Sequence, residues 1–324
     1  MFAIEDLTVS IGPGTGPVDL VTGVSLAIAP GEILGLVGES GCGKSMTSLA
    51  AMGLLPKPGP RIRGGRILLD GVDVTRLEPW QRVEAGHGAM AMIFQEPMTS
   101  LNPVRRVGDQ IIEAVRVRER ISMAAATDRA HELLDLVRIP DAALQLSAFA
   151  HQLSGGMRQR VMIAIALAAR PRVLIADEPT TALDVTVQYQ ILGLLRELCD
   201  RLDIATLFIT HDMGVIAQLA DRVAVMYAGR IVETAAVREL FAAPAHPYSR
   251  SLMACMPIRG IGSPRLRTIP GQAPQPGSIR AGCMFAPRCP DARPPCQVNV
   301  PTIHVLTAGH EALCDFPVTD GRPI

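Results

Sequence analysis

The stretch ILGLVGESGCGKS, residues 33–45, decides the fold of this chain. Its opening run, Ile33 to Val37, is wholly apolar, which is typical of a buried parallel β-strand. After Ser45, apolar residues recur at helical spacing until Pro56. A glycine-rich loop between a strand and a helix is the setting of a phosphate-binding loop. The sequence therefore predicts an α/β fold that binds phosphate groups in this loop.

The predicted phosphate loop offers backbone and side-chain groups that suit a nucleoside triphosphate. Its glycines let backbone N–H groups close around the β-phosphate, Lys44 neutralises phosphate oxygens, and the Ser45 hydroxyl completes the coordination shell of Mg²⁺. An ordinary glycine-rich turn is the alternative, which the strand and the helix on either side disfavour. The residues expected to hold the nucleotide are Gly38, Glu39, Ser40, Gly41, Cys42, Gly43, Lys44, Ser45 and Met46.

Two further apolar runs end in polar residues. The run from Val173 to Ala176 ends in Asp177 and Glu178, and the run from Ala205 to Ile209 precedes His211. Because an open α/β sheet places its ligand at the carboxyl ends of its strands, these side chains are expected at the nucleotide. We expect Asp177 to hold Mg²⁺, Glu178 to orient or deprotonate the attacking water, and His211 to contact the γ-phosphate. The predicted catalytic residues are Lys44, Glu178 and His211.

The stretch LSGGMRQR, residues 153–160, is a second element that suits an anion. It opens a helix with the Ser154 hydroxyl and the backbone N–H groups of Gly155 and Gly156, as helix ends that bind anions do. The chain already has a complete phosphate loop, so a second such element predicts a site shared with another polypeptide. Helical apolar periodicity in residues 105–150 predicts a helical insertion just before it.

Composition narrows the class of protein. The 324 residues are 48% hydrophobic, which allows a substantial core, and 31 basic residues balance 31 acidic ones. This balance disfavours a nucleic-acid partner. The apolar runs are shorter than the roughly 18 residues that read as a membrane-spanning helix, and the first residues show no secretory signal. We therefore expect a globular protein of the cytosol.

The order of these motifs resembles the ATP-binding cassette (ABC) ATPases: the phosphate loop, Gln95, residues 153–160, Asp177 with Glu178, the TALD stretch 181–184, and His211. The resemblance implies an α/β fold with a P-loop NTPase core of the ABC type, a mixed sheet and a helical subdomain. It also implies ATP and Mg²⁺ as ligands, with Ser45, Gln95 and Asp177 at the metal. Further nucleotide contacts are implied for Ser154, Gly155, Gly156, Gln159 and Asp184, in a head-to-tail dimer.

A finer resemblance is carried by FQEPMTSLNP at 94–103, VGDQI at 107–111, HPYSR at 246–250, IPG at 269–271 and CMFAPRCP at 283–290. These stretches are similar to ATPase subunits of oligopeptide and dipeptide (peptide, nickel and opine) importers. The resemblance implies a second, paralogous ATPase subunit, two permease subunits and an extracytoplasmic binding protein, at the cytoplasmic face of the inner membrane. A soluble ABC ATPase that acts on nucleic acid or ribosomes is the alternative. The transported solute stays open.

The same resemblance suggests the domain boundaries. We expect an ATPase domain over residues 1–240, with its core in 1–96 and 160–240 and a helical subdomain in 97–159. Fourteen of the 26 prolines fall between Pro244 and Pro323, a density that disfavours long regular elements. Residues 241–324 are therefore expected to form a small, loop-rich C-terminal domain.

Four of the seven cysteines lie in this C-terminal part, at Cys283, Cys289, Cys296 and Cys314. In a reducing cytosol such clustering favours a metal site over disulfides. The intervals are longer than those of usual zinc ligands and suit an iron–sulfur cluster better, and the resemblance implies a 4Fe-4S cluster in some members. Zinc, a ligand set that includes His304 or His310, and no metal at all are the alternatives. Separately, Cys42 is expected to have a lowered pKa at a helix N-terminus.

Overall fold

The computed structural model describes residues 1–12, 16–84, 90–95, 100–181, 183–256, 268–278, 281–319 and 322–323. The chain forms two compact units. The first unit comprises residues 1–2, 28–32 and 76–208, and the second comprises residues 3–27, 33–75 and 209–324. Among the described residues, no helix has the length and apolarity that a bilayer crossing requires.

The second unit contains a four-stranded sheet in the order β2-β1-β4-β5 and five strands of a larger mixed sheet in the order β11-β12-β10-β9-β3. Strands β3 and β9 are parallel, whereas β9 with β10, β10 with β12 and β11 with β12 are antiparallel. The sheet is therefore mixed, as predicted. The strands are β1 (Phe2–Ile11), β2 (Val18–Ile28), β3 (Ile33–Val37), β4 (Arg61–Leu69), β5 (Val72–Asp73), β9 (Arg222–Tyr227), β10 (Arg230–Ala236), β11 (Ile303–Thr307) and β12 (His310–Leu313).

Strand β3 is the apolar run that the sequence assigned to a buried strand. All five of its residues are buried, and it pairs with β9 in a register that sets Leu34 opposite Arg222 and Val37 opposite Val225. Helix α9 (Met213–Leu219) packs on β3, where a Cβ at Gly35 would lie 2.5 Å from Ile216 Cδ1. Helix α1 (Lys44–Met52) follows directly after the glycine-rich loop. The predicted strand, loop and helix are thus confirmed.

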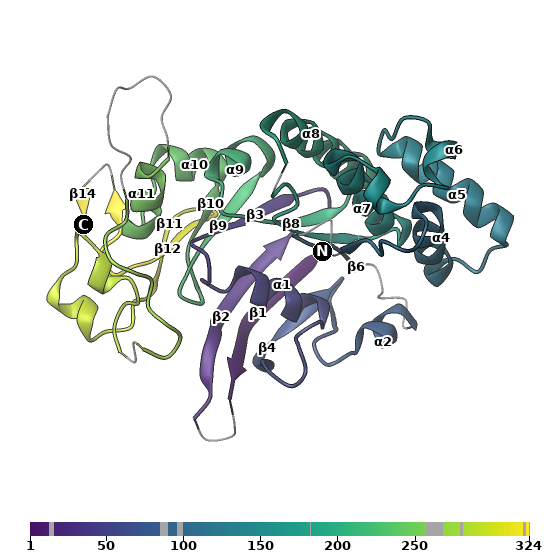
Figure 1. Cartoon of the computed structure of the whole chain (residues 1–324). Helices are drawn as coiled ribbons and strands as arrows, with labels where there is room; N and C mark the ends of the chain where they lie inside the picture. The colour runs from purple at the N-terminus through teal and green to yellow at the C-terminus, as the bar shows by residue number, and fades with distance from the viewer. Residues whose placement is uncertain are drawn as a thin grey trace. The chain divides into compact units, whose positions relative to one another are not determined.

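The first unit contains strands β6 (Met90–Ile93) and β7 (Val173–Asp177), which pair in parallel. Strand β8 (Ala205–Thr210) starts in this unit, and its last two residues belong to the second. Figure 1 shows helices α4, α5 and α6 gathered together, and α4, α5 and α7 pack against one another. This group is the predicted helical insertion. The helices are α2 (Pro79–Glu84), α4 (Val107–Arg118), α5 (Met123–Leu136), α6 (Ala142–Gln145), η1 (Ala150–Gln152), α7 (Gly155–Ala168) and α8 (Val185–Leu202).

The C-terminal residues contain more regular structure than their proline content suggested. Strand β12 pairs with β10, setting Ala312 opposite Glu233. Strands β9, β10 and β12 belong to the same compact unit, which extends across residue 240. Besides β11 and β12, the elements after β10 are α10 (Val237–Ala242), α11 (Pro247–Ala254), η2 (Ala286–Arg288), η3 (Pro294–Gln297), β13 (Val318–Thr319) and β14 (Arg322–Pro323).

A buried carboxylate and an aromatic cluster hold this part of the chain to the sheet. Glu233 accepts hydrogen bonds from the backbone N–H groups of Ala245 (2.7 Å) and His246 (2.9 Å), and His310 Nε2 lies 2.8 Å from the same carboxylate. The bond to Glu233 raises the pKa of His310, whereas burial lowers the pKa of His246 to about 4. The rings of Tyr227, Tyr248 and Phe285 pack on one another and are fully buried.

Replacing His310 by Leu should lower the free energy of unfolding by about 2 kcal/mol at pH 6, because it leaves part of a buried carboxylate without a donor. The folded-state pKa of His310 is raised above its ordinary 6.5, so the added stability of the charged pair is complete below that pH. It fades as the pH rises through the raised value, and the loss in His310→Leu should shrink by pH 9. Urea unfolding at both pH values measures this.

The matched control is His304→Leu, on the exposed strand β11 of the same hairpin, which should change stability by no more than about 0.5 kcal/mol. A loss in His310→Leu that stays constant from pH 6 to pH 9 would contradict the charged pair.

Candidate functional site

The glycine-rich loop lies so close to strand β9 that Gly38 has no room for a side chain. A Cβ at Gly38 would lie 2.1 Å from the carbonyl oxygen of Met226, and one at Gly43 would lie 2.8 Å from Met226 Cε. Gly43 also has a φ of 111°, which side chains disfavour, and it caps α1. The backbone N–H of Gly229 donates to the Cys42 carbonyl at 2.8 Å. These contacts fix the course of the loop.

Lys44 folds back over its own loop. Its ammonium group donates to the carbonyl oxygens of Gly38 (2.8 Å) and Glu39 (3.1 Å), and the side chain is buried. Ser45 is exposed in the first turn of α1. The loop thus carries a charged ammonium and an accessible hydroxyl next to the N-terminus of a helix. That arrangement favours an anion such as a polyphosphate.

Cys42 differs from the expectation of a reactive thiol. Its side chain is only 4% exposed, and burial raises its pKa more than the nearby Lys44 lowers it. The prediction of a lowered pKa is wrong, because desolvation of the thiolate outweighs the ammonium and the helix N-terminus.

In the first unit, the structure brings Gln95 and Glu178 together. Gln95 Nε2 donates to Glu178 Oε2 at 3.0 Å, and the Thr181 hydroxyl donates to the same oxygen at 3.2 Å. Asp177 is buried at the end of β7, and Glu178 follows it with a φ of 46°. A positive φ is unusual for a residue with a side chain and often occurs at functional sites. The Asp177 carboxylate is therefore buried at the strand end, whereas the Glu178 carboxylate accepts hydrogen bonds from Gln95 and Thr181.

Ser154 caps the start of helix α7. The Ser154 hydroxyl accepts a hydrogen bond from the backbone N–H of Met157 at 3.3 Å. At Gly156 a Cβ would lie 2.7 Å from Val187, so this glycine allows α7 and α8 to pack closely. Gln159 is fully buried, and its amide has no hydrogen-bond partner among the described residues. The structure thus gives no support to a nucleotide contact by Gln159, since its side chain lies in the interior.

The other predicted residues lie at helix starts and strand ends. Asp184 is exposed and caps α8 by accepting from the Val187 N–H at 2.9 Å. His211 is exposed directly after β8, in the second unit with residues 38–46. Gln95, Ser154, Asp177, Glu178 and Asp184 belong to the first unit. Of the predicted motifs, residues 96–99 and 182 lie outside the described part of the chain.

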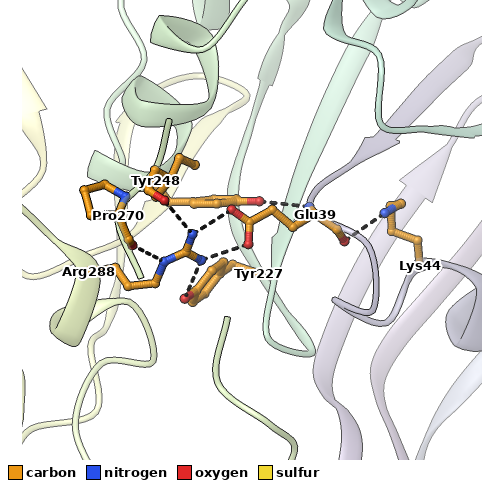
Figure 2. A network of polar contacts seen from close by, with 7 residues as sticks. Glu39, Lys44, Tyr227, Tyr248, Pro270 and Arg288 are labelled. Carbon is orange, nitrogen blue, oxygen red and sulfur yellow. Dashed lines mark hydrogen bonds and ion pairs between the residues drawn. The ribbon is translucent and has the colours of Figure 1, made fainter. Parts of the chain in front are cut away.

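Sequence reasoning missed a set of contacts to the phosphate loop from the far end of the chain (Figure 2). Arg288 binds the Glu39 carboxylate with two nitrogen atoms, at 2.8 and 3.0 Å, and the Glu39 backbone N–H donates to the Tyr248 hydroxyl at 3.0 Å. Arg288 also donates to the carbonyl of Pro270 and to the Tyr227 hydroxyl. Hydrogen bonds to Glu39 raise the pKa of Arg288. No local pattern signals contacts between residues 249 positions apart.

The four clustered cysteines line one small pocket together with His246, Phe285 and Phe316. All four are free, half-buried thiols. Burial raises the pKa of Cys289 to about 11 and that of Cys314 to about 12. In the described ranges, no three Cys, His, Asp or Glu side chains lie close enough to hold a metal ion. The structure therefore brings the cysteines together without forming a metal-binding group.

A larger cavity, of about 480 Å³, opens beside the phosphate loop within the second unit. Gly41 lines it, together with Val18 and Leu20 of β2 and with Gln275 and Pro276 of the C-terminal part. Its volume is in the range of small-molecule sites. A space large enough for a small molecule therefore lies next to the loop.

Two sequence models of known families match the chain. The family described as "ABC transporter" matches residues 21–181, and the one described as "Oligopeptide/dipeptide transporter, C-terminal region" matches residues 232–296. The second match covers most of β10, most of the cysteine pocket and Arg288. The two matches agree with the motifs from which the family was predicted.

Relatives match over nearly the whole chain. The oligopeptide transport ATP-binding proteins OppD and AppD of Bacillus subtilis are 49% and 46% identical, over 89% and 92% of this chain and 81% and 91% of their own lengths. The dipeptide transport ATP-binding protein DppD of Escherichia coli is 44% identical over 99% of this chain and 98% of its own. These relatives give no support to the alternative of an ATPase that acts on nucleic acid or ribosomes.

Solved structures agree with the fold. The dimeric ATP-binding cassette MJ0796, in a post-hydrolysis state with ADP and Pi, superposes with a TM-score of 0.64 at 26% identity and covers 74% of this chain and 99% of its own. The match leaves out part of the chain, whereas the curated relatives extend over it. From the motifs, the fold and these relatives together, the chain belongs to the ABC transporter family, as an ATP-binding subunit.

Proposed function

We propose that this chain hydrolyses ATP to drive the uptake of peptides or related small solutes through a membrane importer. The observation that carries the proposal is the C-terminal region, residues 232–296, which matches the oligopeptide and dipeptide transporter family. That region lies beside a phosphate loop with the charge and shape of an anion site. Relatives named for dipeptide and oligopeptide transport support this class of solute.

The proposed importer supplies the partners. Two permease subunits form the path through the membrane, an extracytoplasmic binding protein delivers the solute, and a second ATPase subunit, a paralogue, completes the pair. The chain then sits as a peripheral subunit at the cytoplasmic face of the membrane. The dimeric state of the cassette MJ0796 supports a paired arrangement.

Within the proposed ATP site, each residue has a separate task. Lys44 and the backbone N–H groups of residues 38–46 would hold the phosphates. Ser45, Gln95 and Asp177 would hold Mg²⁺, which would supply positive charge next to the phosphate oxygens. Glu178 accepts a proton from the attacking water, and Gln95 orients its carboxylate through the 3.0 Å hydrogen bond. His211 contacts the γ-phosphate. The cavity beside Gly41 receives the base and ribose.

The start of α7 completes the ATP site of the second subunit in this proposal. Ser154, Gly155 and Gly156 present the N-terminus of a helix of 14 residues, whose backbone N–H groups attract phosphate oxygens. Asp184 stands at the start of α8, against which α7 packs. The domain division at residues 97, 160 and 241 also stays a proposal.

We further propose that the cysteine pocket holds a 4Fe-4S cluster through Cys283, Cys289, Cys296 and Cys314. The convergence of all four thiols on one pocket supports this. A single zinc ion needs sulfur atoms within about 4 Å of one another, since each Zn–S bond is about 2.3 Å. The long and uneven sequence intervals between the four cysteines suit a cluster better than a single zinc ion. Such a cluster would cross-link a region with little core of its own.

Replacing Glu178 by Gln should leave ATP binding within about twofold of the wild type and lower turnover in the assembled importer at least about 100-fold, because the proton acceptor is lost. In cells that lack the chain, the wild type should restore uptake of a labelled dipeptide or oligopeptide, and Glu178→Gln should not. Binding of ATP, steady-state hydrolysis and uptake measure the three effects.

The matched control is Glu197→Gln on α8, which removes an exposed carboxylate that pairs with Arg138. It should keep near wild-type turnover. Wild-type hydrolysis by Glu178→Gln would contradict the role of this residue, and undiminished peptide uptake without the chain would contradict the proposed solute class.

Protein purified without oxygen should contain about four iron atoms and acid-labile sulfide per chain, with broad visible absorption. Cys289→Ser should lose most of the iron. Cys199→Ser, at a buried thiol that contacts Thr206, should keep it and serves as the control. Stoichiometric zinc without iron, or no metal at all, would contradict the cluster.

A further inference from the structure

The phosphate loop contains an acidic residue in an unfavourable place. Glu39 lies between Gly38, whose carbonyl binds Lys44, and the loop residues that face the proposed phosphates. A carboxylate at this position opposes a polyphosphate anion, and partial burial weakens the screening that water provides. The Glu39 side chain is 25% exposed. The loop therefore needs a compensating positive charge that Lys44, which is bound to the loop carbonyls, does not give to this carboxylate.

Arg288 provides that charge (Figure 2). Its two terminal nitrogen atoms bind the two oxygen atoms of the Glu39 carboxylate, at 2.8 and 3.0 Å, and its side chain is 6% exposed. Paired hydrogen bonds of this kind combine charge with a fixed direction. The guanidinium is held in turn by the carbonyl of Pro270 at 2.8 Å and the Tyr227 hydroxyl at 3.3 Å. Groups of the chain itself thus hold Arg288 in position.

The backbone of Glu39 is held as firmly as its side chain. Its N–H donates to the Tyr248 hydroxyl at 3.0 Å, and its carbonyl accepts from Lys44 at 3.1 Å. Tyr248 is fully buried against Tyr227 and Phe285. Both groups that reach the loop from the C-terminal part, Tyr248 and Arg288, therefore rest on a rigid aromatic cluster.

We propose that Arg288, supported by Tyr248, is a positioning residue of the ATP site: it neutralises Glu39 and fixes the phosphate loop in the form that receives the triphosphate. The inference rests on the proposed placement of ATP at residues 38–46. It gives the C-terminal part of the chain a role in nucleotide binding that acts through the phosphate loop. It also explains why a carboxylate is tolerated inside an anion-binding loop.

The experiment measures the dissociation constant of MgATP for the full-length chain by calorimetry. Arg288→Gln should weaken binding about tenfold, which corresponds to about 1.4 kcal/mol. Arg288→Lys, which keeps the charge but not the paired geometry, should lose less. The double variant Glu39→Gln with Arg288→Gln should regain most of the lost affinity, because removal of the carboxylate removes the repulsion. A purely structural ion pair would not show this recovery.

Three controls separate the possible failures. Arg250→Gln removes another arginine of the same region, whose partner is Asp291 at 3.5 Å, and should bind MgATP as the wild type does. Thermal unfolding without nucleotide checks that each variant folds. Lys44→Ala should abolish binding, and if it binds normally, the proposed ATP site is wrong. If Lys44→Ala loses binding while Arg288→Gln binds as tightly as the wild type or more tightly, or if the double variant recovers nothing, the inference about Arg288 is overturned.

Discussion

The close approach of the phosphate loop to strand β9 is the constraint on which the proposed site depends. With a Cβ at Gly38 only 2.1 Å from the Met226 carbonyl, the loop can follow this course only if that position stays glycine. The parallel pairing of β3 with β9 sets the distance, because the loop leaves the end of β3. This course of the loop fixes the position of Lys44 over the loop and the residue at which α1 starts. The direction of the Glu39 side chain toward Arg288 follows as well.

The C-terminal part of the chain builds on the same sheet. Strand β12 pairs with β10, and the buried Glu233 binds two backbone N–H groups and His310, which fixes the start of α11 beside the strand. Tyr248 of α11 can then reach the backbone of Glu39. Cys289 directly follows Arg288, so the segment that binds Glu39 also lines the cysteine pocket. In the proposed importer, one region would serve both the nucleotide site and the metal cluster.

Local sequence patterns predicted those parts of the fold that depend on residues close together in the sequence. The apolar run at Ile33 to Val37, the loop and α1 form as expected, because strand burial and helix spacing are written in consecutive residues. A place for Gln95 in the site was expected only through the family resemblance, and its contact with Glu178 was not predicted. Four features escaped sequence reasoning. Burial of Cys42 and Gln159 depends on tertiary packing, and the Arg288–Glu39 pair joins residues 249 positions apart. Proline density also understated the C-terminal strands, whose pairing partner lies in β10.

The central claim is that the phosphate loop and the C-terminal part form one ATP site. Hydrogen–deuterium exchange of the full-length chain, with and without MgATP, tests it most directly. We expect slower exchange on ATP binding both in residues 38–46 and in the segments around Tyr248 and Arg288, since the loop and its supports tighten together. Protection confined to the loop, with exchange around Arg288 unchanged, would contradict the claim.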